Sequence, residues 1–320
     1  MKVLMVGHGA FAQKHMDGIN NIDGVEVVSL CGRRPDATRA AAEERGIRHW
    51  STDLGDCLMQ DVDAVIITSA TQVHATQAIQ CLQAGKHVQI EIPMADTLSD
   101  SRAILAAQQE MAQNGTKLVA MAGHTRRFNP SHQWIHKKIQ AGELTVQQMD
   151  VQTYFFRRSN MNAAGGVRSW TDHLLWHHAC HTVDLFQYQT GQTASQAFAL
   201  QGPPHPELGI AMDMSIGLKV PSGAICTLSL SFNNNGPLGT FFRYICDNGT
   251  YLARYDDLVD GYEKPIDVSR VDVSMNGIEL QDREFFAAIR EGREPNASVA
   301  QCLPAMETLD RLERSLDSQN

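Results

Sequence analysis

The sequence lacks the features that mark membrane-spanning, secreted and nucleic-acid-binding proteins. Its 320 residues carry 27 Lys and Arg against 36 Asp and Glu, so no basic excess is present to bind a phosphate backbone. No uninterrupted apolar run approaches the roughly 18 residues that a membrane span needs. The seven cysteines are odd in number, scattered and free of C-x-x-C spacing, which is typical of reduced intracellular thiols.

Length and composition bound the organisation. An apolar strand pattern begins at residue 2 and leaves no room for a signal peptide, so we expect a cytoplasmic protein with no membrane and no nucleic-acid partner. A chain of 320 residues with 43% hydrophobic content can bury a large core and is long for one domain. Two domains are therefore the first expectation.

The N-terminus predicts a dinucleotide site. The apolar segment 2–6 runs into a G-x-G-x-x-A pattern formed by Gly7, Gly9, Ala10, Phe11 and Ala12. Gly7 and Gly9 permit a sharp turn and the close approach of a pyrophosphate, and Ala12 permits close packing of a helix on the strand. A tight strand-to-helix turn without a nucleotide is the alternative. The strand before the pattern and the helix after it favour the dinucleotide.

The end of the second strand pattern, residues 25–30, indicates which nicotinamide cofactor binds. NAD enzymes usually carry Asp or Glu there for the ribose 2′-hydroxyl, whereas this chain has Gly32 followed by Arg33 and Arg34. Two guanidinium groups suit a 2′-phosphate. The sequence therefore predicts NADP as the cofactor.

Hydrophobic periodicity predicts the fold of the first 123 residues. Strand patterns near 2–6, 25–30, 64–68, 86–92 and 117–122 alternate with helical patterns near 11–21, 35–45, 73–84 and 97–114. This alternation is typical of an α/β protein. It predicts a Rossmann fold, a doubly wound parallel sheet, over residues 1–123.

The remainder, residues 124–320, predicts an α+β domain. A helix near 130–141, a strand near 147–157 and a helix near 172–190 precede several β runs between 194 and 254, which indicates a mostly antiparallel sheet. Two closing helices, near 279–291 and 298–316, are expected to return to the domain junction. We expect this domain to bind substrate and to form a homodimer through its sheet.

Basic residues concentrate between His124 and His181, which enclose seven of the thirteen histidines and five arginines. A locally positive region in an acidic protein suits a small anionic substrate, and bidentate arginine is a natural carboxylate clamp. The candidates are Arg126, Arg127, Arg157, Arg158 and Arg168. For any single arginine, the alternative is a solvated surface charge.

Three histidines are spaced for a shared helical face. His173, His177 and His181 stand at i, i+4 and i+8, and Asp184 follows one turn later. One interpretation is a zinc site; the other is proton transfer by an imidazole that titrates near neutrality. Hydride transfer needs only a base for the alcohol proton, so we expect no metal. His177 and His181 are the preferred catalytic residues, and His173 and His178 are expected to be structural.

With these residues, the chain resembles the Gfo/Idh/MocA family of NAD(P)-dependent oxidoreductases over nearly its whole length. The resemblance rests on Gly7 and Gly9 with His15, and on the segments 71–74, 84–87, 126–128 and 181–185. It implies an oxidoreductase with His181 as the catalytic histidine. It also implies further cofactor contacts from Thr71, His74, Glu91 and Pro93.

The chain departs from the family pattern at two positions. The family's Glu-Lys-Pro, whose lysine serves catalysis, reads Glu91-Ile92-Pro93 here. The family's Asp four residues before the catalytic histidine is replaced by His177. Alcohol oxidation on a sugar ring, which this family commonly performs, therefore does not follow from the resemblance.

Within the family, segments 124–130, 168–173 and 231–234 are similar to those of members that use NADP to oxidise a cyclic hemiacetal with two carboxylates to a lactone. The similarity implies a small dicarboxylate substrate. It would be bound by His124, Arg126, Arg127, Arg168, Trp170 and Asp172. Two alternatives stay open. A sugar or polyol dehydrogenase gives no reason for the missing lysine, and a non-catalytic NADP-binding sensor is favoured by that loss but opposed by the retained His181.

Overall fold

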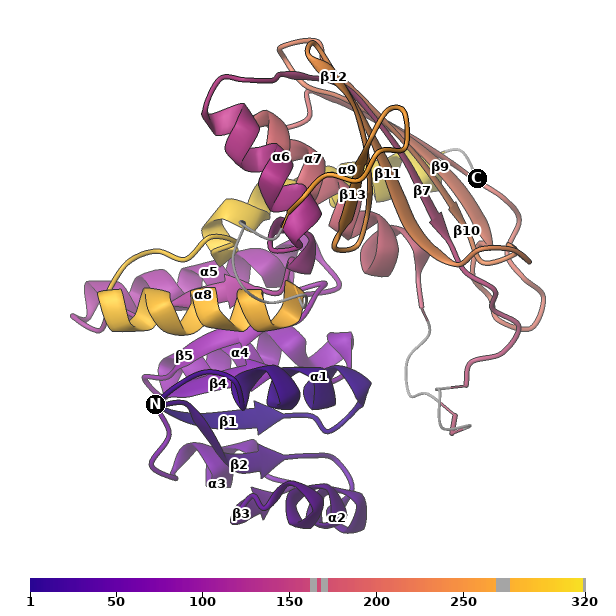
Figure 1. The fold of residues 1–320 in the computed structure, drawn as a ribbon. Helices are drawn as coiled ribbons and strands as arrows, with labels where there is room; N and C mark the ends of the chain where they lie inside the picture. Colours follow the sequence, from indigo (N-terminus) through magenta and orange to yellow (C-terminus); the bar gives the residue numbers. More distant parts are fainter. Residues whose placement is uncertain (162–165, 168–171, 269–276, 319–320) are drawn as a thin grey trace. The chain divides into compact units, whose positions relative to one another are not determined.

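The computed structural model describes residues 1–161, 166–167, 172–268 and 277–318, and these form two compact units (Figure 1). The first unit comprises Met1–His124 with Ile278–Leu303, and the second comprises Thr125–Gly277 with Pro304–Asn320. The closing segment Ile278–Leu303 thus groups with the N-terminal residues by its contacts. The last change of unit falls at Pro304, inside a helix.

Within the described residues, the first unit contains a parallel sheet of six strands in the order β3-β2-β1-β4-β5-β6. The strands are β1 (Lys2–Val6), β2 (Glu26–Cys31), β3 (His49–Ser51), β4 (Ala64–Ile67), β5 (His87–Ile90) and β6 (Ala120–Ala122). The helices are α1 (Ala10–Ile19), α2 (Pro35–Arg45), α3 (Leu54–Leu58), α4 (His74–Gln83), α5 (Leu98–Gln113) and α8 (Gly277–Glu291), with a 3-10 turn η1 (Thr71–Val73).

Strand burial explains why these apolar runs form the centre of the sheet. Every residue of β4 is buried, as are all residues of β1 after Lys2, because helices cover both faces of a parallel sheet. The strand order reverses between β1 and β4, and ligands of such sheets bind at this point, beyond the carboxyl ends of the strands. The predicted doubly wound parallel sheet is confirmed.

The second unit, in its described part, contains a seven-stranded sheet in the order β13-β12-β11-β7-β10-β9-β8. Its strands are β7 (Val146–Tyr154), β8 (Gln196–Gln201), β9 (Asp213–Lys219), β10 (Ile225–Ser231), β11 (Gly239–Cys246), β12 (Gly249–Arg254) and β13 (Asp257–Asp260). All neighbours are antiparallel except β7 and β10, which confirms the predicted mostly antiparallel sheet. Its helical elements are the 3-10 turn η2 (Thr125–Arg127), α6 (Pro130–Gln140), the π-helix η3 (Leu174–Ala179), α7 (Cys180–Thr190) and most of α9 (Val299–Asp317).

The structure differs from the sequence predictions in two ways. It contains the short elements β3 and α3, which were not predicted because runs of three and five residues are too short to show periodicity. The single helix predicted over 172–190 is instead a π-helix followed by α7. Among the described residues, no helix is both long and apolar enough to cross a membrane.

A buried charge network joins α8 to the core of the first unit. His15, on α1, places Nδ1 at 2.8 and 3.0 Å from the two carboxylate oxygens of Asp282 and Nε2 at 3.1 Å from Oε1 of Glu91. Gln89 donates to Asp282 and Gln281 donates to Glu91. Burial alone would lower the pKa of His15, but the two carboxylates raise it to about 10. The ring is therefore an imidazolium held between two acids.

Replacing His15 with Gln should destabilise the protein by about 3–5 kcal/mol near pH 6.5, because it leaves two buried carboxylates without their cation. Since the pKa is raised on folding, this contribution is complete below the unfolded value of about 6.5 and is lost as pH rises through about 10. Urea unfolding at pH 6.5, 8 and 9.5 measures the free energy of unfolding of the native protein and of the variant. The difference between the two should become smaller as the pH rises.

The matched control is His205→Gln, which removes a histidine from the loop between β8 and β9, where Nδ1 of its ring accepts the backbone N–H groups of Glu207 and Leu208. The free energy of unfolding of this variant should differ little from that of the native protein at each pH. A large loss of unfolding free energy in His15→Gln that stays constant between pH 6.5 and 9.5 would contradict the charged state of His15.

Candidate active site

The turn after β1 is shaped to receive an anion. Gly7 has φ +103°, and a Cβ there would lie 2.7 Å from Oγ1 of Thr68, so no side chain fits. Gly9 precedes α1, and a Cβ built on it meets nothing within 4 Å. No side chain caps α1, and its first residues, Ala10 and Phe11, are exposed. The N-terminal N–H groups of α1 are therefore not satisfied by a side-chain cap, as a pyrophosphate site requires.

The next turn, after β2, excludes a carboxylate and presents two cations. A Cβ on Gly32 would lie 2.2 Å from Oγ1 of Thr38 and 2.9 Å from Cδ2 of His8, so neither Asp nor Glu fits there. Arg33 and Arg34 are exposed, and neither has an ion-pair partner in the part of the chain that the structure describes. Burial, with the charge of Arg34, lowers the pKa of His8.

The other predicted cofactor residues lie in the segments that follow β4 and β5, where their polar groups have partners within the protein. Both ring nitrogens of His74 contact backbone oxygens, Nδ1 that of Pro93 at 2.9 Å and Nε2 that of Ser69 at 3.1 Å. Thr71 is buried and bonds to Asp96, and Glu91 belongs to the His15 network. These side chains brace the loops that would border a cofactor.

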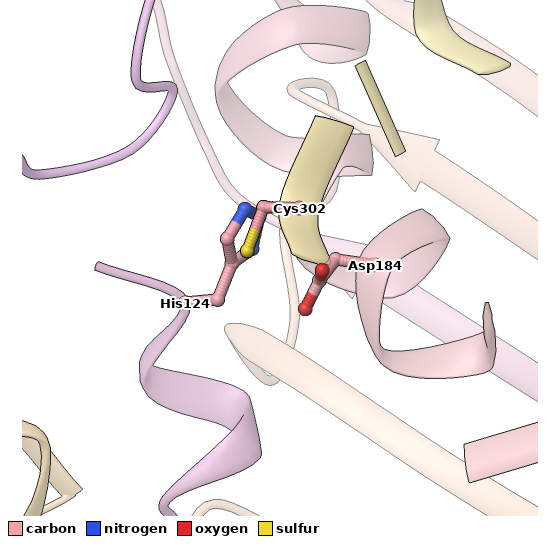
Figure 2. A group of neighbouring side chains, drawn as sticks. All are labelled: His124, Asp184 and Cys302. Carbon is pink, nitrogen blue, oxygen red and sulfur yellow. The ribbon is translucent and has the colours of Figure 1, made fainter. Parts of the chain in front are cut away.

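His124 ends the first unit and is buried beside Cys302 of the same unit (Figure 2). A ring nitrogen of His124 and the sulfur of Cys302 lie within 4.8 Å of each other. The sequence predicted His124 as a substrate contact. The structure places it at the end of the turn after β6, with little exposed surface.

In the second unit, Arg127 is paired within the protein. Its Nε and Nη2 donate to the two carboxylate oxygens of Asp184, at 2.8 and 2.6 Å, and its guanidinium lies 4.6 Å from the ring centre of Tyr188. Asp184, also drawn in Figure 2, lies on α7 and is 1% exposed. A buried bidentate pair of this kind fixes η2 on α7 and uses two of the guanidinium's donor groups.

A second ion pair joins Arg157, just after β7, to the predicted substrate residue Asp172. The Arg157 guanidinium lies 5.2 Å from the ring centre of Phe232. His178 places Nε2 4.0 Å from the Asp172 carboxylate, and its ring lies 5.1 Å from those of Phe155 and Phe232. Asp172 is therefore the charge partner of Arg157, and the pair lies in a largely buried region next to aromatic rings.

The histidine series does not stand on one regular α-helix. His173 precedes the π-helix, and its Nδ1 accepts the N–H of Leu175 at 3.2 Å. In return, the N–H of His173 donates to Nδ1 of His177 at 2.9 Å. The two rings thus form a reciprocal cap, a role usually filled by Ser or Thr with Glu. π-Helical turns occur frequently at functional sites, and this one leads directly into α7 and His181.

The reciprocal cap has a consequence for proton transfer. Burial, only partly opposed by Asp172, lowers the pKa of His177 to about 4. Its ring is therefore neutral at pH 7, with Nδ1 occupied as an acceptor and the proton on Nε2. His181 lies half-buried on α7, within the helical turn that precedes Asp184.

Two predicted substrate residues, Arg168 and Trp170, lie outside the described residues. The remaining one, Arg126, is half-buried beside Asn129 and Tyr255, which sequence reasoning did not select. The dipeptide Asn129-Pro130 is typical of a helix start, so the sequence could have placed Asn129 at the first turn after Arg126. Tyr255 lies in a hairpin turn that is distant in sequence, and nothing in the pattern links it to Arg126.

Two family models match the chain. The model for the oxidoreductase family with an NAD-binding Rossmann fold, GFO_IDH_MocA, matches residues 1–117, and the model for bacterial oxidoreductases, C-terminal, matches residues 130–272. Among solved structures, an oxidoreductase from Agrobacterium radiobacter in complex with NAD+, L-tartaric acid and magnesium has a TM-score of 0.85 at 16% identity. This alignment covers 100% of this chain and 97% of the Agrobacterium radiobacter chain. Levoglucosan dehydrogenase, solved with NADH and levoglucosan, has a TM-score of 0.84 at 18% identity. That alignment covers 100% of this chain and 98% of the levoglucosan dehydrogenase chain.

Curated sequences give a stronger match. The 4-carboxy-2-hydroxymuconate-6-semialdehyde dehydrogenase of Sphingobium sp. is 65% identical over 320 residues, which is 100% of both chains. Inositol 2-dehydrogenase 2 of Paenarthrobacter aurescens is 25% identical over 264 residues, covering 81% of this chain and 77% of that one. The chain therefore belongs to the Gfo/Idh/MocA family of NAD(P)-binding oxidoreductases.

Proposed function

We propose that this protein is an NADP-dependent dehydrogenase that oxidises the cyclic hemiacetal form of 4-carboxy-2-hydroxymuconate-6-semialdehyde to 2-pyrone-4,6-dicarboxylate, a step in protocatechuate 4,5-cleavage. The observation that carries the proposal is 65% identity over the full length of a relative with that semialdehyde dehydrogenase activity in its name. The turn after β2 and the arginines of the second unit support it independently.

The chemistry favours the hemiacetal over the open aldehyde. An aldehyde must first be hydrated or bound by a cysteine before it can lose hydride, and each of the seven cysteines is buried. The hemiacetal carbon already bears the hydrogen and the hydroxyl, so loss of hydride and of the hydroxyl proton gives the lactone directly. Bound NADP would supply the hydride acceptor.

The protein's task is then to hold the ring and to remove one proton. His181 is the residue that we assign as general base, because it stands at the family's catalytic histidine position and is half-buried on a rigid helix. His177, whose Nδ1 accepts the N–H of His173 and whose ring is kept neutral at pH 7 by burial, positions the start of α7. Arg126, Arg127, Arg168, Trp170, His124 and Asp172 remain proposed contacts or supports of the substrate.

NADP is the proposed cofactor because the turn after β2 has no space for the carboxylate that would repel a 2′-phosphate. Arg33 and Arg34 supply two exposed guanidinium groups without acidic partners in the described chain. We also propose a homodimer through the second unit's sheet. Phe198 and Leu200 on its edge strand β8, each 60% exposed, support an interface there.

The native protein should bind NADP about ten to a hundred times more tightly than NAD, since charge-assisted hydrogen bonding to the 2′-phosphate should contribute about 1.5–3 kcal/mol in total. Replacing Arg33 and Arg34 with Ala should remove most of this preference and leave NAD affinity unchanged. Fluorescence titration of both cofactors measures it. Arg39→Ala, which removes an exposed arginine of α2 paired with Asp36, is the control. Equal affinities of the native protein for NAD and NADP would contradict the assignment.

His181→Asn should lower kcat by about 10²–10⁴ and leave NADP affinity nearly unchanged, because general-base assistance is lost while the cofactor turns are untouched. His177→Asn should also slow turnover, but the apparent pKa of the remaining activity between pH 5 and 9 should not move. The His177 ring with a pKa of about 4 is already neutral across that range. Near-native turnover of His181→Asn would transfer the role to another group.

The protocatechuate 4,5-cleavage product, supplied with NADP, should yield 2-pyrone-4,6-dicarboxylate in amounts that match the NADPH formed. Inositols and other neutral polyols serve as the comparison substrates, since inositol dehydrogenases are among the more distant relatives. Good turnover of a polyol without turnover of the semialdehyde would favour a polyol dehydrogenase. NADP binding without turnover of either would favour a sensor.

A further inference from the structure

The arginines of the second unit differ in whether the protein itself neutralises them. Arg127 is paired with Asp184, and Arg157 is paired with Asp172. Arg126, in the part of the chain that the structure describes, has no carboxylate within ion-pair distance. A buried or half-buried cation without an anionic partner is costly, and such sites commonly receive the missing charge from a ligand.

The immediate surroundings of Arg126 hold the guanidinium without a direct ion pair in the described chain, and Tyr255 and the charge of Asp256 compensate its charge only in part. Its Nη1 donates to Oδ1 of Asn129 at 3.2 Å, and the group lies 4.8 Å from the ring centre of Tyr255. Its Nε is buried and meets no hydrogen-bond partner among the described residues. Burial lowers the pKa of Arg126, although arginine stays charged at neutral pH. One donor of a charged fork therefore remains to be satisfied.

Asn129 is used in an uncommon way. It stands at the N-cap of α6, where asparagine normally accepts a backbone N–H, but its side chain forms no cap. Oδ1 accepts from Arg126 instead, and Nδ2 donates to Oδ1 of Asp256 at 2.8 Å. Asp256 thus bonds to Asn129 and forms no direct ion pair with the guanidinium in the described part of the chain, although its charge still favours the charged form of Arg126.

The turn that carries Tyr255 is fixed from two sides. Tyr255 adopts φ +52° between β12 and β13, and its carbonyl accepts the hydroxyl of Ser131 from α6. A Cβ on Gly239 would lie 2.5 Å from the Tyr255 hydroxyl, so glycine is required there. A non-glycine residue with positive φ is strained and persists where its surroundings impose it. The aromatic face beside Arg126 is thus held in place.

We propose that Arg126, and neither Arg127 nor Arg157, binds a carboxylate of the substrate, with Asn129 and Tyr255 as the residues that position its guanidinium. The inference rests on the proposed function for the identity of the ligand as a dicarboxylate. Arg127 and Arg157 hold carboxylates of the protein and support the fold around the site. The planar fork of Arg126 matches a carboxylate in a way that a lysine would not.

Calorimetric titration of the NADP-loaded protein with benzene-1,3-dicarboxylate tests this, because the probe matches the relative placement of the two carboxylates in the proposed product. Arg126→Gln should weaken binding about ten- to hundred-fold, and Arg126→Lys should fall between it and the native protein. The neutral benzene-1,3-dicarboxamide should bind native and variant proteins equally. Thermal unfolding of each variant verifies that it is folded.

Arg158→Gln is the matched control, since Arg158 is exposed and its side chain donates, within the described residues, to the carbonyls of Arg157 and Phe232. It should bind the dicarboxylate as the native protein does. Unchanged affinity in Arg126→Gln, or an equal loss in Arg158→Gln, would overturn the inference, and native turnover of the semialdehyde would leave the proposed function standing. A native protein that neither binds the probe nor turns over the semialdehyde would overturn both.

Discussion

The compensation of buried charge is the constraint on which the rest of this structure depends. In the first unit, His15 is held between Glu91 and Asp282, which ties a helix from the end of the chain to the first helix and to the loop after β5. In the second unit, Arg127 with Asp184 does the same for η2 and α7. Because a buried charge left alone costs several kcal/mol, these pairs fix which elements meet.

Much of the architecture could be predicted from the sequence, since it depends on local pattern. The apolar runs of β1 and β4 are fully buried, as continuous hydrophobic strands of parallel sheets are, and Gly7 adopts the positive φ that its motif implies. The role of Gly32 could be predicted only in part. Arg33 and Arg34 after it indicated a phosphate, but the lack of space for a side chain at Gly32 comes from Thr38 and His8, which the sequence pattern does not place beside it.

What the sequence could not predict depends on partners far apart in the chain. Asp184 stands 57 residues from Arg127, and Asp282 stands 267 residues from His15, so neither pairing follows from spacing. The same holds for Tyr255 and Arg126. Helical periodicity placed His173, His177 and His181 on one face but did not reveal the π-helical turn, in which the His173 ring accepts the N–H of Leu175 and the His177 ring accepts the N–H of His173.

The π-helix before α7 makes the orientation of α7 sensitive to the number of residues in one short segment. A residue in an α-helix turns the chain by about 100°, so removing one of the six residues Leu174–Ala179 and relaxing the turn would rotate every side chain of α7 by roughly that angle. His181 and Asp184 would then swing away from their present directions together. An insertion or deletion in this segment would therefore redirect both side chains without altering either residue.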